Sequence, residues 1–157
     1  MAVPITSDRV VADLVDRYPG IILVDAWGEQ SLFYNPGQRL LRGIYFATIK
    51  QKDGDNDRAS HLNRPGVFRF NLGTPKPLYM ARFGHPPARP GKGQVIDGPW
   101  DFTALDQLTP HPVYGWMSWV AVLNPSAQTF ADISPLIEAA FDKAKAAFAK
   151  KTGHRPL

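Results

Sequence analysis

The sequence predicts an α+β protein in which a mostly antiparallel sheet is covered on one face by an N-terminal and a C-terminal helix. Segments of β-branched or alternating apolar residues recur between Pro- and Gly-containing turns, and segments with apolar residues at helical spacing stand near both ends. Strands joined by such short turns pair antiparallel, because parallel neighbours need a long crossover. At 157 residues the chain fits one α+β domain, residues 1–157, with a single core.

The first element is an amphipathic helix near the N-terminus. Thr6 and Ser7 are suited to cap it, and Pro19-Gly20 stops it. Its apolar residues recur three and four positions apart and therefore line one face: Val10, Val11, Leu14, Val15 and Tyr18.

Four strands follow in the first half of the chain. Their apolar patterns predict them at residues 21–26, 31–34, 44–50 and 67–72. The turn Asn35-Pro36-Gly37 separates the second strand from the third, so the early sheet is a meander. The polar connection 53–57 ends in Asp57, which we expect to cap a short helix that runs through Leu62.

The middle of the chain is expected to be largely irregular. A short helix is predicted at residues 78–83, and a loop rich in Pro and Gly follows at about residues 84–100. One or two helical turns are predicted at residues 103–108. The longest continuous apolar stretch, residues 116–123, indicates a central strand.

The last element is a long helix. Ser134 is expected to cap it, Pro135 to occupy its first turn and Gly153 to end it. Its apolar residues form one stripe: Leu136, Ile137, Ala140, Phe141, Ala144 and Phe148.

Basic residues are concentrated in the middle third of the chain. The net charge is +4, yet residues 58–96 include no Asp or Glu. The basic residues of this interval are Arg58, Arg64, Arg69, Lys76, Arg82, Arg89 and Lys92. The asymmetry favours an anionic small molecule or an acidic protein surface as the partner, with nucleic acid as the alternative.

Several classes of protein are disfavoured by the composition. The absence of Cys excludes disulfides, thiolate metal ligands and a cysteine nucleophile. The N-terminal segment lacks the pattern of a secretory signal, and no apolar run approaches the roughly 20 residues that span a bilayer. We therefore expect a cytoplasmic protein with no membrane partner. The sequence leaves the oligomeric state open.

Two short motifs resemble ion or phosphate sites, and neither is complete. Asp53-x-Asp55-x-Asp57 begins like a calcium loop, but Arg58 and Arg64 occupy the positions of its turn glycine and its bidentate Glu. Gly91-Lys92-Gly93 lacks the preceding strand and following helix of a phosphate loop. The interpretation is a solvated turn in the first case and a flexible loop in the second, so we predict neither a metal site nor a cofactor.

The leading candidate site lies on the strand at residues 67–72. Along this strand Arg69 and Asn71 share the face opposite Phe68 and Phe70, which are expected to face the core. Guanidinium and amide donors on a rigid strand are suited to hold a carboxylate or phosphate, whereas a charged face that protects a sheet edge is the simpler interpretation. The full set of predicted ligand-binding residues is Arg64, Arg69, Asn71, His111, Tyr114 and Trp119.

Two other functions stay open. Nucleic-acid binding would add Arg82, Arg89 and Lys92 as phosphate contacts, with aromatic side chains for stacking. A small hydrolase or isomerase would use His85 or His111 with a carboxylate as an acid–base pair, and the carboxylates in question are Asp101 and Asp106. The leading hypothesis is a non-enzymatic binding module, for which no catalytic residue is assigned.

Several blocks of residues carry a family resemblance. The segment Leu62–Asn71 contains the block R-P-G-V-F-R-x-N, and His111-Pro112-Val113-Tyr114 forms a second block. With Ala26-Trp27-Gly28 and Asn124-Pro125, these blocks resemble a small bacterial family of unknown function over nearly the whole chain. More distantly, the order of elements is similar to that of the MmcQ/YjbR-like proteins. That resemblance implies an α+β fold, in a group for which DNA binding has been proposed.

Overall fold

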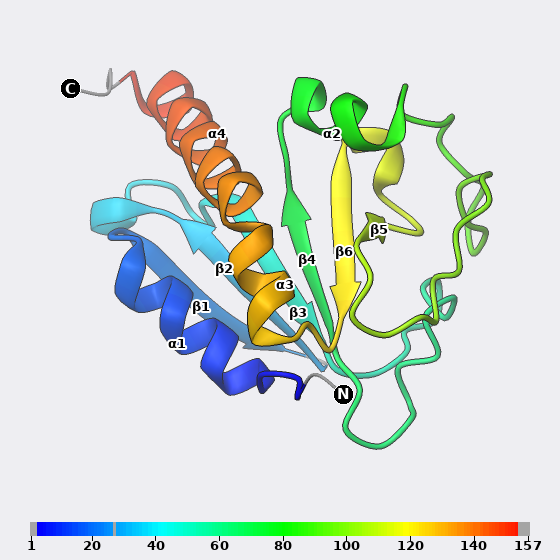
Figure 1. Ribbon diagram of the computed structural model, residues 1–157. Coiled ribbons are helices and arrows are strands. Elements are labelled where there is room, and N and C mark those ends of the chain that lie inside the picture. The colour runs from blue at the N-terminus through cyan, green and yellow to red at the C-terminus, as the bar shows by residue number, and fades with distance from the viewer. Residues whose placement is uncertain (1–2, 27, 154–157) are drawn as a thin grey trace.

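The computed structural model describes residues 3–26 and 28–153, in which a layer of helices covers one face of a sheet (Figure 1). The helices are α1 (Ser7–Arg17), α2 (Lys76–Phe83), α3 (Ala127–Asp132) and α4 (Ser134–Thr152), with short 3-10 helices η1 (Pro36–Gln38) and η2 (Gly115–Met117). The strands are β1 (Ile21–Ala26), β2 (Glu29–Tyr34), β3 (Ile44–Lys50), β4 (Arg69–Gly73), β5 (Thr109–Pro110) and β6 (Trp119–Leu123).

Within the described residues, six strands form one sheet in the order β1-β2-β3-β4-β6-β5, and every neighbouring pair is antiparallel. The first four strands form a meander. Strand β6 enters between β4 and β5, so it lies inside the sheet as its apolar sequence predicts. The α+β class and the antiparallel pairing are therefore confirmed.

Helices α1 and α4 lie on the same face of the sheet, and α4 crosses its middle strands (Figure 1). The predicted apolar stripe of α4 is buried in full. The ring of Phe141 lies 4.4 Å from that of Tyr18 and 5.6 Å from that of Phe46, so α1, α4 and β3 meet at one aromatic cluster. The Thr6 hydroxyl accepts a hydrogen bond from the Arg9 amide, which confirms the predicted N-cap of α1.

The opposite face of the sheet, which we call the outer face, is divided into an open and a covered half. Over β1 to β3 it is open, and Val24 and Tyr45 are each about half exposed. Over β4 and β6 it is covered by connecting segments, so Arg69 and Asn71 are buried. The expectation that the Arg69 face of its strand is exposed is therefore wrong, because β4 is an interior strand with a cover on both sides.

Three helical predictions are wrong for identifiable reasons. Residues 57–62 form turns, because Asp57 bonds Arg69 with both carboxylate oxygens instead of capping helix amides. Residues 103–108 also form turns, with a bridge from Leu105 to β6. The N-cap position of α4 is Ile133 rather than Ser134, because α3, which sequence analysis missed, leads directly into α4.

The long loop after α2 is confirmed as irregular through residue 100. The strand predicted at 116–123 begins only at Trp119, since residues 115–117 form η2. None of the helices within the described residues combines the length and apolarity that a bilayer crossing requires.

Candidate functional site

The guanidinium of Arg69 is the centre of a buried polar network. It is 1% exposed and bonds both carboxylate oxygens of Asp57, with Nη1 to Oδ1 at 3.0 Å. The same Nη1 donates to the Ser60 hydroxyl at 3.0 Å, and Nε donates to the Asn71 side chain at 2.7 Å. The Asn71 amide in turn donates to the Thr48 hydroxyl at 3.0 Å. These bonds offset the desolvation of the cation, which would otherwise be very costly.

His111 completes this network from the other side. Its Nε2 lies 3.1 Å from Nη2 of Arg69, and its Nδ1 accepts the amides of Val113 and Tyr114 at 3.0 Å each. Burial first, and then the positive charges of Arg69 and Lys50, lower the pKa of His111 well below 6.5. The imidazole is therefore neutral at pH 7. It fixes the turn that follows it by accepting these two backbone amides.

The predicted ligand-binding residues thus meet only in part, and mostly out of reach of solvent. Arg69, Asn71 and His111 come together, but each is buried and occupied by internal bonds. Arg64 donates to three backbone carbonyls, those of Ser60, His61 and Thr103, so it fastens the loops of the cover. Arg64 and Arg69 therefore do not form an exposed arginine row.

Two aromatic members of the predicted set have different surroundings. Trp119 is partly buried on the outer face, with its ring centroid 6.4 Å from that of Tyr45. Tyr114 is 49% exposed and its ring lies 5.0 Å from that of His111. Tyr114 therefore projects from the buried network to the surface.

Tyr114 lines a pocket that was not predicted from the sequence. We call it the loop pocket; its volume is ≈330 Å³, and the residues that define it are Asn56, Arg89, Lys92, Tyr114 and Trp116. The guanidinium of Arg89 lies 4.9 Å from the centroid of the Trp116 ring, which is a cation–π contact. The pocket therefore brings together Arg89 and Lys92, which were predicted as nucleic-acid contacts, and Tyr114, which was predicted as a ligand-binding residue.

The buried network lies behind both walls of the loop pocket. One wall carries Asn56, whose neighbour Asp57 is bonded to Arg69. The other wall carries Val113 and Tyr114, whose amides bond His111, and the His111 ring contacts the same guanidinium. Arg69 is thus connected, through Asp57 and His111, to two of the segments that line the loop pocket.

The acid–base pair that a hydrolase or isomerase would need is not formed within the described residues. Within the described residues His85 makes no hydrogen bond to a carboxylate, and the polar side chain that the His111 ring nitrogens approach is that of Arg69. Asp101 accepts from the amide and hydroxyl of Thr103, and Asp106 accepts from the Ser126 amide at 2.7 Å. In the part of the chain that the structure describes, neither carboxylate hydrogen-bonds His85 or His111.

The acidic turn is likewise used internally. Asp53 accepts the Leu62 amide at 2.8 Å, and Asp57 is paired with Arg69. Over the described ranges, 3–26 and 28–153, no group of three or more His, Asp or Glu side chains is placed to hold a metal ion. The prediction of a solvated turn is therefore correct only in part: Asp55 is exposed, whereas Asp53 and Asp57 make internal bonds.

These features define a class: an α+β protein with helices on one face of an antiparallel sheet and an arginine-centred network under loops on the other. The chain belongs to a family of unknown function, DUF6194, whose family model matches residues 5–153. This confirms the resemblance to a family of unknown function. No curated protein and no solved structure matches the chain. The more distant resemblance to the MmcQ/YjbR-like proteins stays a prediction.

Proposed function

We propose that this protein is a non-enzymatic binding module for a small anionic molecule, and that the loop pocket is its site. One observation carries the proposal. Arg89 and Lys92 line the same pocket, and within the described residues neither has a carboxylate oxygen within 4.0 Å. An anion is the ligand that two such cations attract most strongly.

Other residues of the pocket would help to orient a bound anion. The Trp116 ring holds the Arg89 guanidinium by its cation–π contact, so the cation loses less freedom when an anion arrives. Asn56 also lines the pocket, and its side chain can offer amide donors. The network fixes the turn at Val113 and Tyr114 and holds Asp57 next to Asn56, so these parts of the lining are preorganised for a ligand.

The shape of the site favours a small molecule over the other partners that the sequence allowed. Its volume of ≈330 Å³ is at the lower end of the range of about 300–1,000 Å³ for ligand pockets. An acidic protein surface would engage a flat basic patch, and a nucleic acid would engage a row of cations. Arg82 lies on α2 and does not line the pocket. Its replacement should therefore affect the binding of a nucleic acid but not the binding of a small anion in the pocket.

Titration of the protein with inorganic pyrophosphate, followed by calorimetry and by NMR, tests the proposal. Arg89→Gln and Lys92→Gln should each weaken binding several-fold, since each removes one charged contact. Arg82→Gln, the matched control, should bind as the unchanged protein does. The proposal is wrong if pyrophosphate does not saturate a site, or if all three variants lose affinity equally.

A second titration addresses the nucleic-acid alternative. A random single-stranded oligonucleotide should bind weakly, with no special role for Arg82. If its affinity is high, falls steeply between about 50 and 200 mM salt and depends equally on Arg82, Arg89 and Lys92, nucleic acid replaces the small anion as the ligand.

A further inference from the structure

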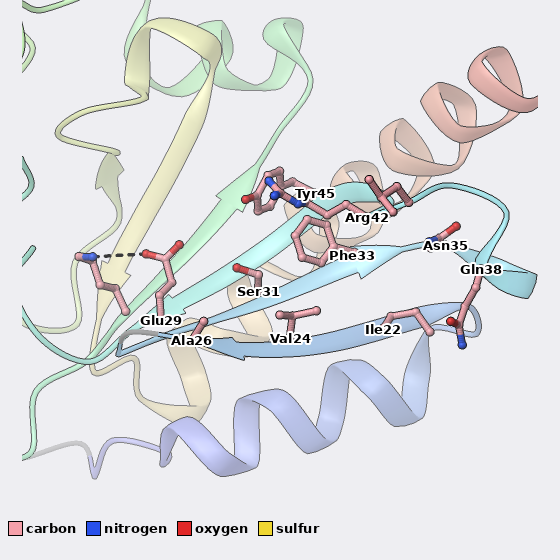
Figure 2. A pocket seen from close by; sticks show the side chains of 12 residues that line it. Ile22, Val24, Ala26, Glu29, Ser31, Phe33, Asn35, Gln38, Arg42 and Tyr45 are labelled. Carbon is pink, nitrogen blue, oxygen red and sulfur yellow. Dashed lines mark hydrogen bonds and ion pairs between the residues drawn. The ribbon is translucent and has the colours of Figure 1, made fainter.

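A second depression lies on the open half of the outer face, over β1, β2 and β3 (Figure 2). We call it the sheet hollow; its volume is ≈750 Å³. None of the residues that define the loop pocket lines it, so the two sites are independent.

The floor of the sheet hollow is apolar. In the antiparallel register Ile22 pairs with Phe33 and Phe33 with Tyr45, so these three side chains lie on one face of neighbouring strands. Val24 continues the row on β1 and is 45% exposed, and Tyr45 is 46% exposed with its ring 4.4 Å from that of Phe33. A contiguous apolar patch that is exposed to solvent often marks a binding surface.

The charged residues at the rim differ in their partners. At one end Lys50 pairs with Glu29, with Nζ and Oε2 at 3.5 Å, as the dashed line in Figure 2 shows. On the β3 side the exposed side chain of Arg42 extends toward Tyr45 (Figure 2), and it has no carboxylate partner within the described residues. The rim therefore offers one uncompensated positive charge beside an apolar floor.

We infer that the sheet hollow binds an amphipathic small anion, whose apolar body lies on β1 to β3 and whose acidic head pairs with Arg42. Charge complementarity selects this occupant. A purely apolar ligand would leave Arg42 unused, and an anion without an apolar body would leave Val24 and Tyr45 exposed. The volume lies in the range of about 300–1,000 Å³ typical of small-molecule sites.

Titration with decanoate and with decanol, both below their aggregation limits and followed by NMR, separates the head from the body. Arg42→Gln should weaken decanoate binding about tenfold, the loss of one charged contact, and leave decanol binding unchanged. The matched control is Arg39→Gln, which removes the same charge three residues away, where Arg39 contacts the Thr152 carbonyl and does not line the hollow. Val24→Thr keeps the β-branched shape, and it should weaken both ligands several-fold.

Four outcomes would overturn the inference. Equal losses in Arg42→Gln and Arg39→Gln would show a general charge effect, and equal affinities for decanol and decanoate would remove the need for a head. Loss of decanoate binding in Arg89→Gln would move the ligand to the loop pocket. Sedimentation that shows self-association abolished by Val24→Thr would make a second copy of the chain the occupant.

Discussion

Replacing Asp57 by Asn should destabilise the protein by about 3 kcal/mol, because it leaves the Arg69 guanidinium buried without its counter-ion. The side chain of Arg69 is 1% exposed and that of Asp57 is 16% exposed. Removal of one partner from a buried ion pair costs about 3–5 kcal/mol, and the lower end applies because Asp57 is in partial contact with water and Asn keeps one acceptor oxygen. For a chain of 157 residues this corresponds to a melting temperature lower by roughly 6–12 °C.

Urea unfolding, followed by far-UV circular dichroism, measures this loss. The matched control is Asp55→Asn, which changes the same charge in the same turn. Asp55 is exposed, and within the described residues its side chain makes no hydrogen bond, since Arg58 bonds its backbone carbonyl; the control should therefore stay within about 0.5 kcal/mol of the unchanged protein. The double variant Asp57→Asn/Arg69→Met should recover part of the loss, because it removes the orphaned charge as well.

A loss below about 1 kcal/mol in Asp57→Asn, or equal losses in the two Asn variants, would show that Asp57 does not compensate the buried charge of Arg69. A double variant less stable than either single change would also contradict the prediction. It would mean that the cavity left by the guanidinium outweighs the buried charge.

Two further predictions concern other buried polar groups. The pKa of His111 is lowered in the folded protein, so below about pH 6.5 the unfolded chain binds a proton that the folded protein does not. The free energy of unfolding should therefore fall by up to about 1.4 kcal/mol for each unit by which the pH is lowered. His111→Gln should remove this part of the slope in urea unfolding between pH 7.5 and pH 5, whereas the exposed His85→Gln should retain it; equal slopes in both would contradict the assignment. Tyr18→Phe removes a hydrogen bond of 2.8 Å to Glu138, which ties α1 to α4, and should cost about 1 kcal/mol in the same assay. A change within error would mean that water replaces the bond without loss.

Local periodicity was enough to predict the elements that pack one face against the core. The six apolar residues of the α4 stripe are all buried, and the strand at 44–50 is found with the predicted bounds. Both depend on side-chain spacing within one element, which the sequence displays directly. The short helices were less predictable. Asp57, expected to cap a helix, pairs with Arg69 instead, and Ser134, expected to cap α4, is its first residue.

The candidate site could not be predicted, because it depends on what covers the outer face. Arg69 bonds Asp57, 12 positions away, and contacts His111, 42 positions away, and no local pattern specifies that these loops fold over β4. One signal was available: an arginine in the middle of an interior apolar strand needs an internal counter-ion, and Asp57 ends the nearest acidic turn. The basic interval was identified correctly, but the meeting of Arg89 and Lys92 with Tyr114 follows from the path of the loop.

The layout of the chain separates the hydrophobic core from the two cations on which the proposed binding site depends. The helix-covered core is built from the meander, from β6 and from α1 and α4, whereas Arg89 and Lys92 lie on an irregular segment that contributes neither strand nor helix. Surface loops of this kind tolerate insertions and exchanges at little cost to the scaffold. On the proposed function, exchanges within this segment would therefore change the charge of the loop pocket and leave the packing of the helix-covered core as it is.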